Sequence, residues 1–335
     1  MTNKMKCWQF HTTSTGLENT LFTPATGTPN PSIFPTQLLI QVHSAALNPA
    51  DYKVAELGLL AKALVPSPSI PGMDFYGTVA ATGKEVQGYQ VGERVFGTRI
   101  ASLGQGSLAE FVVVGVEMVT RAPEGVDGDE LAGVGVAGLT AYQCIVGNVG
   151  EGDRVFVNGG SGGTGVFGIQ IAKALGCWVL ATCSTANVRL CEKLGADEVL
   201  DYTRVDVVRE VEAMGRVFKL VVDNVGAPAN LYRASHRFLV PDGRFCQVGA
   251  GFSLQQVAQM GSNMLLPGFL GGGKNKYEMV LAKPVSKHLA QIGRWMKEGK
   301  VRTVIDEVFE FENVPNAFRK LKTGRAKGKI IVHVK

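Results

Sequence analysis

Apolar and polar positions change their spacing about one third of the way along the chain. Before residue 126, short apolar runs bounded by glycine and proline predict β-strands over residues 37–47, 77–83 and 93–98, and two more strands within 107–125. Several short strands at close spacing are typical of a small antiparallel barrel. The first third of the chain is therefore expected to form a β-domain.

After residue 126 the pattern alternates between helices and strands. An apolar, alanine-rich stretch over residues 127–150 predicts a helix, and the acids near its start suit a helix N-terminus. Strands are expected at 153–159, 177–183, 197–202, 218–226, 243–250 and 328–334, and helices at 164–176, 186–195, 286–300 and 313–324. The strands up to residue 250 are apolar on both faces, as buried parallel strands are. Such a series predicts an α/β fold with a doubly wound parallel sheet.

A glycine motif lies between the first of these strands and its helix. Gly160, Gly162 and Gly165 fit G-x-G-x-x-G, directly after an apolar strand and at the start of a helix. Glycine lets the backbone approach a pyrophosphate, and the free N–H groups of the helix N-terminus favour the anion. The context favours a dinucleotide site over a merely structural tight turn.

The residues after the second strand of this series bear on the choice of cofactor. An NAD site usually has an acid about 20 residues after the glycines, but no Asp or Glu occurs between Arg154 and Cys191. Ser184, Asn187 and Arg189 stand in that region instead, and such groups can bond a 2′-phosphate. We therefore expect NADPH rather than NADH, while Arg189 could equally face solvent on its helix.

Composition and charge exclude several classes of protein. The net charge of +5 permits anionic ligands, and nothing in the sequence resembles a nucleic-acid-binding motif. The six cysteines contain no C-x-x-C pair, and no apolar run is long enough for a membrane span, so a reduced, cytoplasmic protein is expected. Basic residues gather late, within 294–329, where they form either a solvated helix face or a surface for a carrier-bound substrate.

Several motifs in the chain resemble those of one family, in the same order. They lie at residues 46–53, 71–86, 91–97, 137–142, 159–165, 194–202, 221–226 and 328–332. With these motifs the chain is similar to the medium-chain dehydrogenase/reductases. The resemblance implies a GroES-like β-barrel domain over residues 1–126, a Rossmann NADP-binding domain over 127–265, and a return segment over 266–335 that completes the first domain.

The resemblance also bears on zinc. Alcohol dehydrogenases of this superfamily hold a catalytic zinc, but Asn48 and the Met73–Asp74 pair stand here at the ligand positions, and residues 98–112 contain no cysteine for a structural zinc. Without a metal there is no Lewis acid to activate an alcohol. The resemblance therefore implies the zinc-independent quinone oxidoreductase-like branch, whose quinone, enone and enoyl reductases use NADPH.

By the same resemblance, Tyr52 is the candidate proton donor, although it could instead only pack against the cofactor. Lys329 could reach a phosphate or only form an ion pair at the surface. The full set of expected cofactor contacts is Asn48, Gly160, Ser161, Gly162, Gly163, Thr164, Gly165, Ser184, Asn187, Arg189, Tyr202, Asn224, Val225, Val248, Gly249 and Lys329.

Two apolar loops, residues 56–71 and 264–279, are expected to line the substrate pocket. They favour an apolar substrate: a quinone, an enone or an enoyl chain. The sequence leaves open a trans-acting enoyl reductase of acyl or polyketide chains, and an NADPH-binding protein without turnover. A homodimer joined at a sheet edge is a further possibility, with residues 243–250 and the segment after them as candidates.

Overall fold

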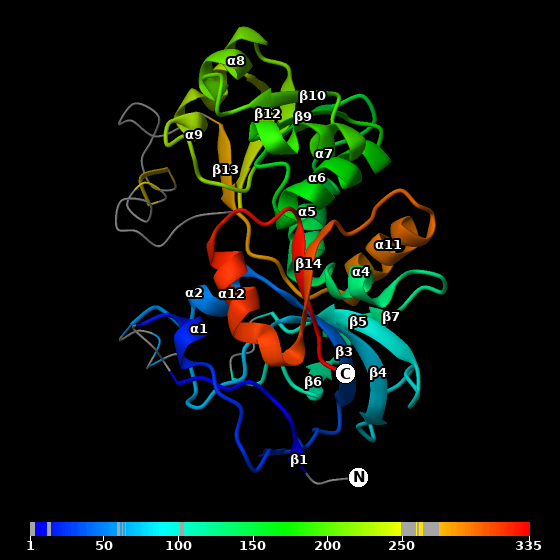
Figure 1. Ribbon diagram of the computed structural model, residues 1–335. Coiled ribbons are helices and arrows are strands. Elements are labelled where there is room, and N and C mark those ends of the chain that lie inside the picture. Colours follow the sequence, from blue (N-terminus) through cyan, green and yellow to red (C-terminus); the bar gives the residue numbers. More distant parts are fainter. Residues whose placement is uncertain are drawn as a thin grey trace. The chain divides into compact units, whose positions relative to one another are not determined.

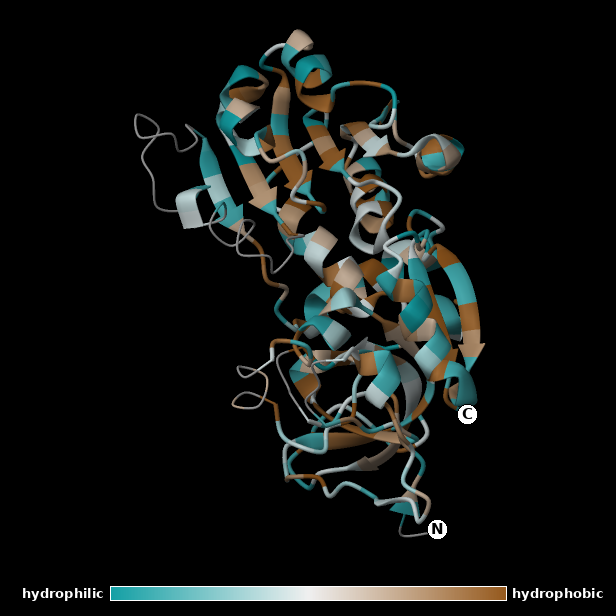
Figure 2. Ribbon diagram, turned by 60° about the vertical axis from the view of Figure 1, so that its left-hand side comes forward, coloured by the Kyte–Doolittle hydropathy of each residue, from teal (hydrophilic) through white to brown (hydrophobic). Residues whose placement is uncertain are grey.

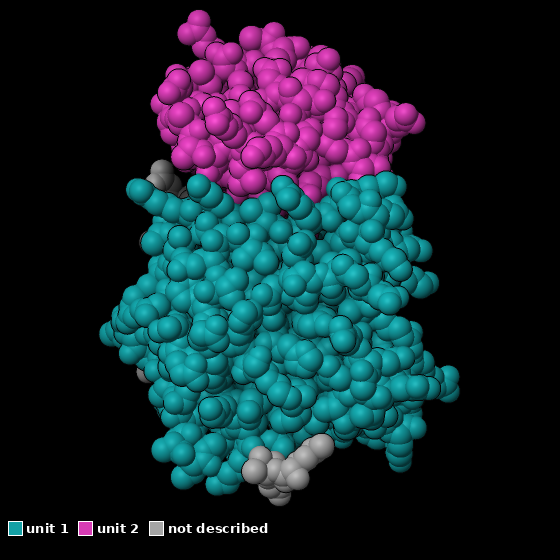
Figure 3. Space-filling model, turned by 45° about the vertical axis from the view of Figure 1, so that its right-hand side comes forward, with its two compact units in different colours: residues 1–139, 283–335 teal, residues 140–282 magenta. Residues whose placement is uncertain are grey.

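The computed structural model divides the chain into two compact units (Figure 3). The first contains residues 1–139 and 283–335, and the second contains residues 140–282. The structure describes residues 4–11, 15–58, 61, 63, 65–100, 104–248, 259, 261–263 and 275–335. The C-terminal segment therefore belongs to the same unit as the N-terminal third.

The second unit is built on a six-stranded parallel sheet (Figure 1). Its strands, in spatial order, are β10 (Glu198–Asp201), β9 (Trp178–Cys183), β8 (Arg154–Asn158), β11 (Phe218–Asp223), β12 (Leu239–Gln247) and β13 (Lys276–Met279). All neighbours run parallel, which confirms the doubly wound sheet. β12 pairs on both sides and is therefore not an edge strand; within the described residues the outer strands are β10 and β13.

Helices connect these strands. α6 (Gly163–Ala174) packs against β8 and β9, and α7 (Val188–Lys193) packs against β9 and β10. Figure 2 shows hydrophobic residues along the strands, and Phe156, Phe218 and Phe238 form an aromatic cluster in this core. The sequence pattern missed α8 (Val207–Ala213), a short helix capped by Asp206, and α9 (Leu231–Ala234).

The first unit is built on a seven-stranded sheet of mixed direction. Its order is β14 (Ile305–Glu310), β15 (Lys329–His333), β3 (Gln37–Leu47), β4 (Asp74–Thr82), β5 (Arg94–Thr98) and β7 (Val119–Arg121), with β6 (Phe111–Gly115) also paired to β3. β15 is antiparallel to β3, so the return segment completes the N-terminal sheet. A small pair, β1 (Lys4–Met5) and β2 (Thr28–Pro29), lies outside it.

Within the described residues, the α-helices of the first unit are α1 (Leu17–Thr20), α2 (Pro49–Lys53), α4 (Gly128–Ala132), α11 (Ser286–Lys297), α12 (Val314–Lys322) and the start of α5 (Gly135–Ile145). None of the helices within the described residues has the length and apolarity needed to cross a bilayer.

The stretch over 127–150 is largely helical, as expected, but it forms two helices because the chain breaks between α4 and α5. At the break, the backbone N–H of Val136 donates to the Asp74 carboxylate at 2.8 Å. A Cβ on Gly135 would lie 2.0 Å from that carboxylate, so the close approach requires glycine there. A contact with a distant strand therefore decides where α5 begins.

Candidate active site

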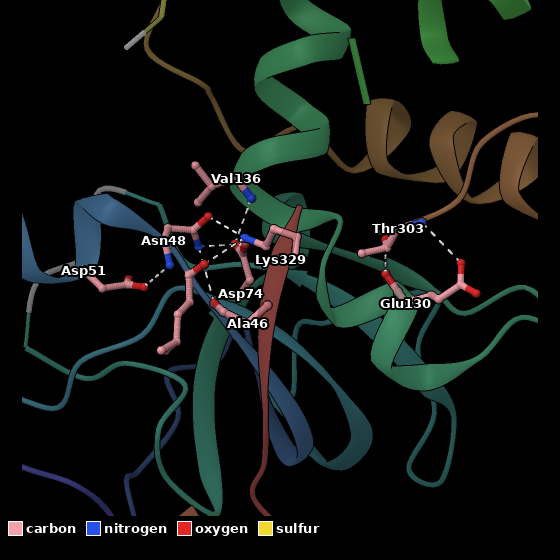
Figure 4. A network of polar contacts seen from close by, with 9 residues as sticks. Ala46, Asn48, Asp51, Asp74, Glu130, Val136, Thr303 and Lys329 are labelled. Atoms are coloured by element: carbon pink, nitrogen blue, oxygen red, sulfur yellow. Dashed lines mark hydrogen bonds and ion pairs between the residues drawn. The ribbon is translucent and has the colours of Figure 1, made fainter. Parts of the chain in front are cut away.

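Three neighbouring strands of the first unit bring Asn48, Asp74 and Lys329 to one place (Figure 4). β3 lies between β4 and β15 in the sheet. Asn48 directly follows β3, Asp74 begins β4 and Lys329 begins β15. Because β3 runs antiparallel to both neighbours, its end lies beside their starts.

Lys329 is 2% exposed, and its ammonium group lies among three oxygens. Its Nζ donates to the carbonyl of Leu47 at 3.1 Å, to Oδ1 of Asn48 at 2.6 Å and to Oδ2 of Asp74 at 3.2 Å. Nδ2 of Asn48 donates to the same carboxylate oxygen at 2.8 Å. Buried charges occur in proteins when they are paired and hydrogen-bonded, as here. The surface ion pair considered for Lys329 is therefore wrong, while its contact with a cofactor phosphate stays a prediction.

The same residues do not fit a catalytic zinc. Among Asn48, Met73 and Asp74, only Asp74 carries a common zinc-binding group. Both of its oxygens already accept hydrogen bonds, from Lys329, Asn48 and the Val136 N–H. In the part of the chain that the structure describes, no group of three or more His, Cys, Asp and Glu side chains could hold a metal ion.

Tyr52 lies on α2, half-buried against the core of the first unit. Nζ of Lys322 lies 5.1 Å from the centre of its ring. Burial, together with the nearby Glu56, raises the pKa of Tyr52, so its phenol keeps its proton at neutral pH. The sequence analysis did not single out the next residue, Lys53, whose pKa is lowered by burial and which is a second candidate proton donor.

Part of the late basic run is bound to acids within the first unit. Lys322 of α12 contacts the carboxylates of Glu18 and Glu56. Lys320 pairs with Asp306 at 3.1 Å, and Lys329 is buried beside Asp74. These lysines are therefore not a uniform solvated face, and their charges are compensated locally.

In the second unit, the glycine motif forms the turn between β8 and α6, and its three glycines have different surroundings. A Cβ on Gly165 would lie 2.1 Å from the carbonyl oxygen of Gly159, and a Cβ on Gly160 would lie 2.9 Å from the side chain of Ala181. A Cβ on Gly162 would have only the Gly159 oxygen nearby, at 3.7 Å. Gly162 is also the residue that precedes the first turn of α6. Gly160 and Gly165 therefore allow close packing, whereas Gly162 faces open space beside free backbone N–H groups.

Asn187 links this loop to the end of β9. Its Nδ2 donates to Oγ of Ser161 at 3.1 Å and lies 3.5 Å from Oγ of Ser184. Its Oδ1 is buried and has no hydrogen-bond partner in the structure. A buried amide oxygen without a partner is unusual, and a ligand hydroxyl could satisfy it. The residues present fit a dinucleotide.

An acid that the sequence analysis missed lies beside this site. In the parallel pairing of β10 with β9, Asp201 is opposite Cys183, and its carboxylate accepts hydrogen bonds from Thr185 and Thr203. These bonds lower the pKa of Asp201, so it is ionised at neutral pH. Arg204 pairs with it at 3.4 Å. The stretch after β9 lacks acids in sequence, but an acid from the next strand comes close in space.

Arg189 and Tyr202 are both exposed, and 57% of the surface of Tyr202 is accessible. Ser184 is half-buried at the end of β9. The structure therefore brings Ser161, Ser184 and Asn187 together, whereas no hydrogen bond or ion pair joins Arg189 or Tyr202 to these three residues.

The ends of β8 and β11 carry the next group of expected contacts. Both the backbone N–H and Nδ2 of Asn224 donate to the carbonyl of Asn158, at 3.1 and 2.9 Å. Val225 follows, and its side chain covers Gly159. Buried Asp223, which the sequence analysis had not selected, accepts from the N–H of Val225 at 3.0 Å and from Nδ2 of Asn158 at 2.8 Å. Burial raises the pKa of Asp223, and its role is to hold this turn.

The remaining expected contacts are less fully described. Val248 follows β12, and its N–H donates to the carbonyl of Asp223 at 2.8 Å. Gly249 lies outside the described residues, as do residues 59, 60, 62, 64 and 264–274 of the two apolar loops.

Two family models match the chain: the alcohol dehydrogenase GroES-like domain over residues 34–124, and the zinc-binding dehydrogenase over residues 194–332. The trans-enoyl reductase pgmF of Aspergillus terreus is 44% identical over 348 residues, covering 98% of this chain and 96% of that protein. The chain belongs to the medium-chain dehydrogenase/reductase superfamily.

Other relatives place the chain in the quinone oxidoreductase-like branch of this superfamily. The mitochondrial NAD(P)H oxidoreductase RTN4IP1 of Danio rerio is 32% identical, covering 90% of this chain and 84% of that protein. The structure of the quinone oxidoreductase from Coxiella burnetii superposes with a TM-score of 0.84 at 28% identity, covering 99% of this chain and all of that one. The chain is thus a nicotinamide-dependent oxidoreductase with a GroES-like and a Rossmann domain, although its residues do not fit the zinc named in one family model.

Proposed function

We propose that this medium-chain reductase uses NADPH to reduce the C=C bond of an apolar α,β-unsaturated carbonyl compound, with an enoyl thioester as the preferred class. The observation that carries the proposal is the buried ammonium of Lys329, which occupies the oxygens of Asn48 and Asp74. With no metal site there to activate an alcohol, the substrate has to be electrophilic already, as a conjugated carbonyl is. The similarity to a trans-enoyl reductase supports an enoyl substrate.

The second unit supplies the residues that would hold the cofactor. The backbone at Ser161–Thr164, before and within the first turn of α6, would bind the pyrophosphate. Ser184, Asn187 and Arg189 would bind the 2′-phosphate, and the pairing of Asp201 with Arg204 reduces the repulsion from that carboxylate. When bound, NADPH supplies the hydride.

The first unit supplies the residues for the proton and for orientation. Hydride addition to the β-carbon places negative charge on the carbonyl oxygen and requires a proton at the α-carbon. The Tyr52 phenol keeps its proton at neutral pH and would deliver it. The Asn48 amide is held at both ends, by Lys329 and by Asp74, so it would present a fixed surface to the nicotinamide.

A quinone reductase is the second candidate, favoured by the likeness to the Coxiella burnetii enzyme. A quinone is also electrophilic without a metal. It accepts hydride at oxygen or carbon and needs no proton at an α-carbon.

A panel of substrates separates the candidates. The purified chain is mixed with NADPH and either a short 2-enoyl thioester of N-acetylcysteamine or a benzoquinone, and NADPH absorbance is followed. A third sample contains an alcohol and NADP⁺. The proposal expects the highest kcat/KM with the thioester and no oxidation of the alcohol. Turnover of the quinone alone would favour the second candidate, and NADPH binding without turnover of any substrate would overturn both.

A further inference from the structure

A second carboxyl group lies beside the Lys329 network and takes no part in the reaction described above. Asp51 is the third residue of α2, and its Oδ2 accepts a hydrogen bond from the backbone N–H of Asn48 at 2.7 Å. In return, the backbone N–H of Asp51 donates to the backbone carbonyl of Asn48 at 3.0 Å. Asp51 is 7% exposed, and its Oδ1 is buried without a hydrogen-bond partner in the structure.

A count of charges shows which carboxyl group is ionised. Two carboxyl groups, those of Asp51 and Asp74, lie near one ammonium group, that of Lys329. Lys329 contacts Asp74 directly, and Asp74 accepts further bonds from Asn48 and the Val136 N–H. A second carboxylate would add an uncompensated charge where water does not reach. The balanced arrangement has an ionised Asp74 and a protonated Asp51.

Two other cations lie near Asp51. Lys53 is on α2 itself, and Lys322, on the helix α12 that packs against α2, contacts Glu18 and Glu56. The charged groups that act on the Asp51 carboxyl are Asp74 and Lys329. Burial raises the pKa of Asp51 to about 8; the charge of Asp74 acts in the same direction, while the Asn48 N–H and Lys329 oppose it. The direction of the pKa shift and the hydrogen bonds therefore both indicate that Asp51 is the protonated carboxyl group.

We propose that Asp51 is a positioning residue that must carry a proton for Asn48 and Lys329 to hold their arrangement, so that its ionisation lowers the activity of the enzyme at alkaline pH. On ionisation, the proton leaves Oδ1 for hydroxide. The new carboxylate then competes with Asp74 for Lys329 and for the Asn48 amide. The effect on activity rests on the proposed reductase function, whereas the protonation of Asp51 does not.

The test compares the wild-type chain with Asp51→Asn, which keeps an acceptor for the Asn48 N–H but cannot ionise. In the wild type, kcat/KM for the enoyl thioester should fall above pH about 8, by about tenfold per pH unit, as for the loss of one proton. In Asp51→Asn this alkaline limb should be absent. Asp127→Asn, which changes an exposed helix-capping acid, is the matched control and should keep the wild-type profile. Identical profiles for the wild type and Asp51→Asn would overturn the proposal.

A measurement without turnover separates this proposal from the proposed function. A carboxyl whose pKa is raised on folding binds its proton more tightly in the folded state, so stability falls as pH rises from about 4 to about 8. Urea unfolding should therefore show the wild type losing stability relative to Asp51→Asn across this range. Parallel curves would contradict a protonated Asp51 even if the enzyme reduces enoyl thioesters. If the variant does not fold, a carbon-13 NMR titration of the aspartate carboxyl groups in the wild type decides: a carboxyl that titrates near pH 8 supports the proposal, and its absence overturns it.

Discussion

The glycine loop of the second unit and the Lys329 network of the first unit are built in opposite ways. The loop uses one continuous stretch, residues 159–165, and works through backbone N–H groups and close approach. The network uses side chains from separate strands, and Lys329 lies 281 positions from Asn48 in the chain. The loop should therefore be sensitive to an added Cβ, and the network to the loss of a charge.

The largest effect is expected from Lys329→Met. It leaves the Asp74 carboxylate buried without its cation, and breaking a buried pair in this way costs about 3–5 kcal/mol. Urea unfolding measures the loss. Lys320→Met, which removes the pairs of a more exposed lysine with Asp306 and Glu307, is the control and should cost much less. Equal losses of unfolding free energy in the two variants would mean that the buried Lys329 pair contributes no more to stability than the more exposed Lys320 pairs.

Next comes Tyr52→Phe, which removes the phenolic proton without changing the packing of the ring. If Tyr52 is the donor, kcat for the enoyl thioester should fall by about 10²-fold or more. The comparison variant is Lys53→Met, on the same helix, which should keep most of its kcat. The reverse result would assign the proton transfer to Lys53.

Gly165→Ala should destabilise the loop by about 1–3 kcal/mol, because its Cβ would meet the Gly159 carbonyl oxygen at 2.1 Å. Gly162→Ala meets no such obstacle, so its cost in stability should be about 1 kcal/mol or less. Unfolding curves and NADPH binding, followed by cofactor fluorescence, separate the two. We expect Gly162→Ala to weaken NADPH binding more than it weakens the fold; equal unfolding free energies for the two variants would refute the packing role of Gly165.

The smallest effect is expected from Ser184→Asp. A carboxylate at this position would repel a 2′-phosphate but not the ribose hydroxyls of NADH. The Kd for NADPH should rise about tenfold, equivalent to about 1.4 kcal/mol, while the Kd for NADH should not rise. Competition binding with both cofactors measures the shift. An unchanged ratio of the two constants would place the 2′-phosphate elsewhere.

The contrast between a site built from one continuous stretch and a site built from separate strands explains what the sequence could predict. β3 (Gln37–Leu47) and the strands around the glycine motif were predicted because their apolar runs are local. β14 (Ile305–Glu310) was missed because its side chains are exposed or half-buried and half of them are acids, so only its pairing with β15 makes it a strand.

Individual side chains were harder to predict than elements. A lysine after glycine near the end of the chain is expected to be exposed. Lys329 of β15 is buried because it pairs with Asp74 of β4, on the far side of β3 in the sheet. Asp201 reaches Thr185 through the register of β10 with β9, which a scan along one segment cannot reveal. In both sites, the contacts that depend on strand order and register could not be predicted from the sequence.

The most direct test of the account is the rate of enoyl thioester reduction by NADPH after the enzyme has been dialysed against a strong chelator, with its zinc content measured in the same sample. We predict an undiminished kcat in a metal-free enzyme, because the Lys329 ammonium already binds the oxygens of Asn48 and Asp74. A rate that falls with the zinc content and returns when Zn²⁺ is added would contradict the account.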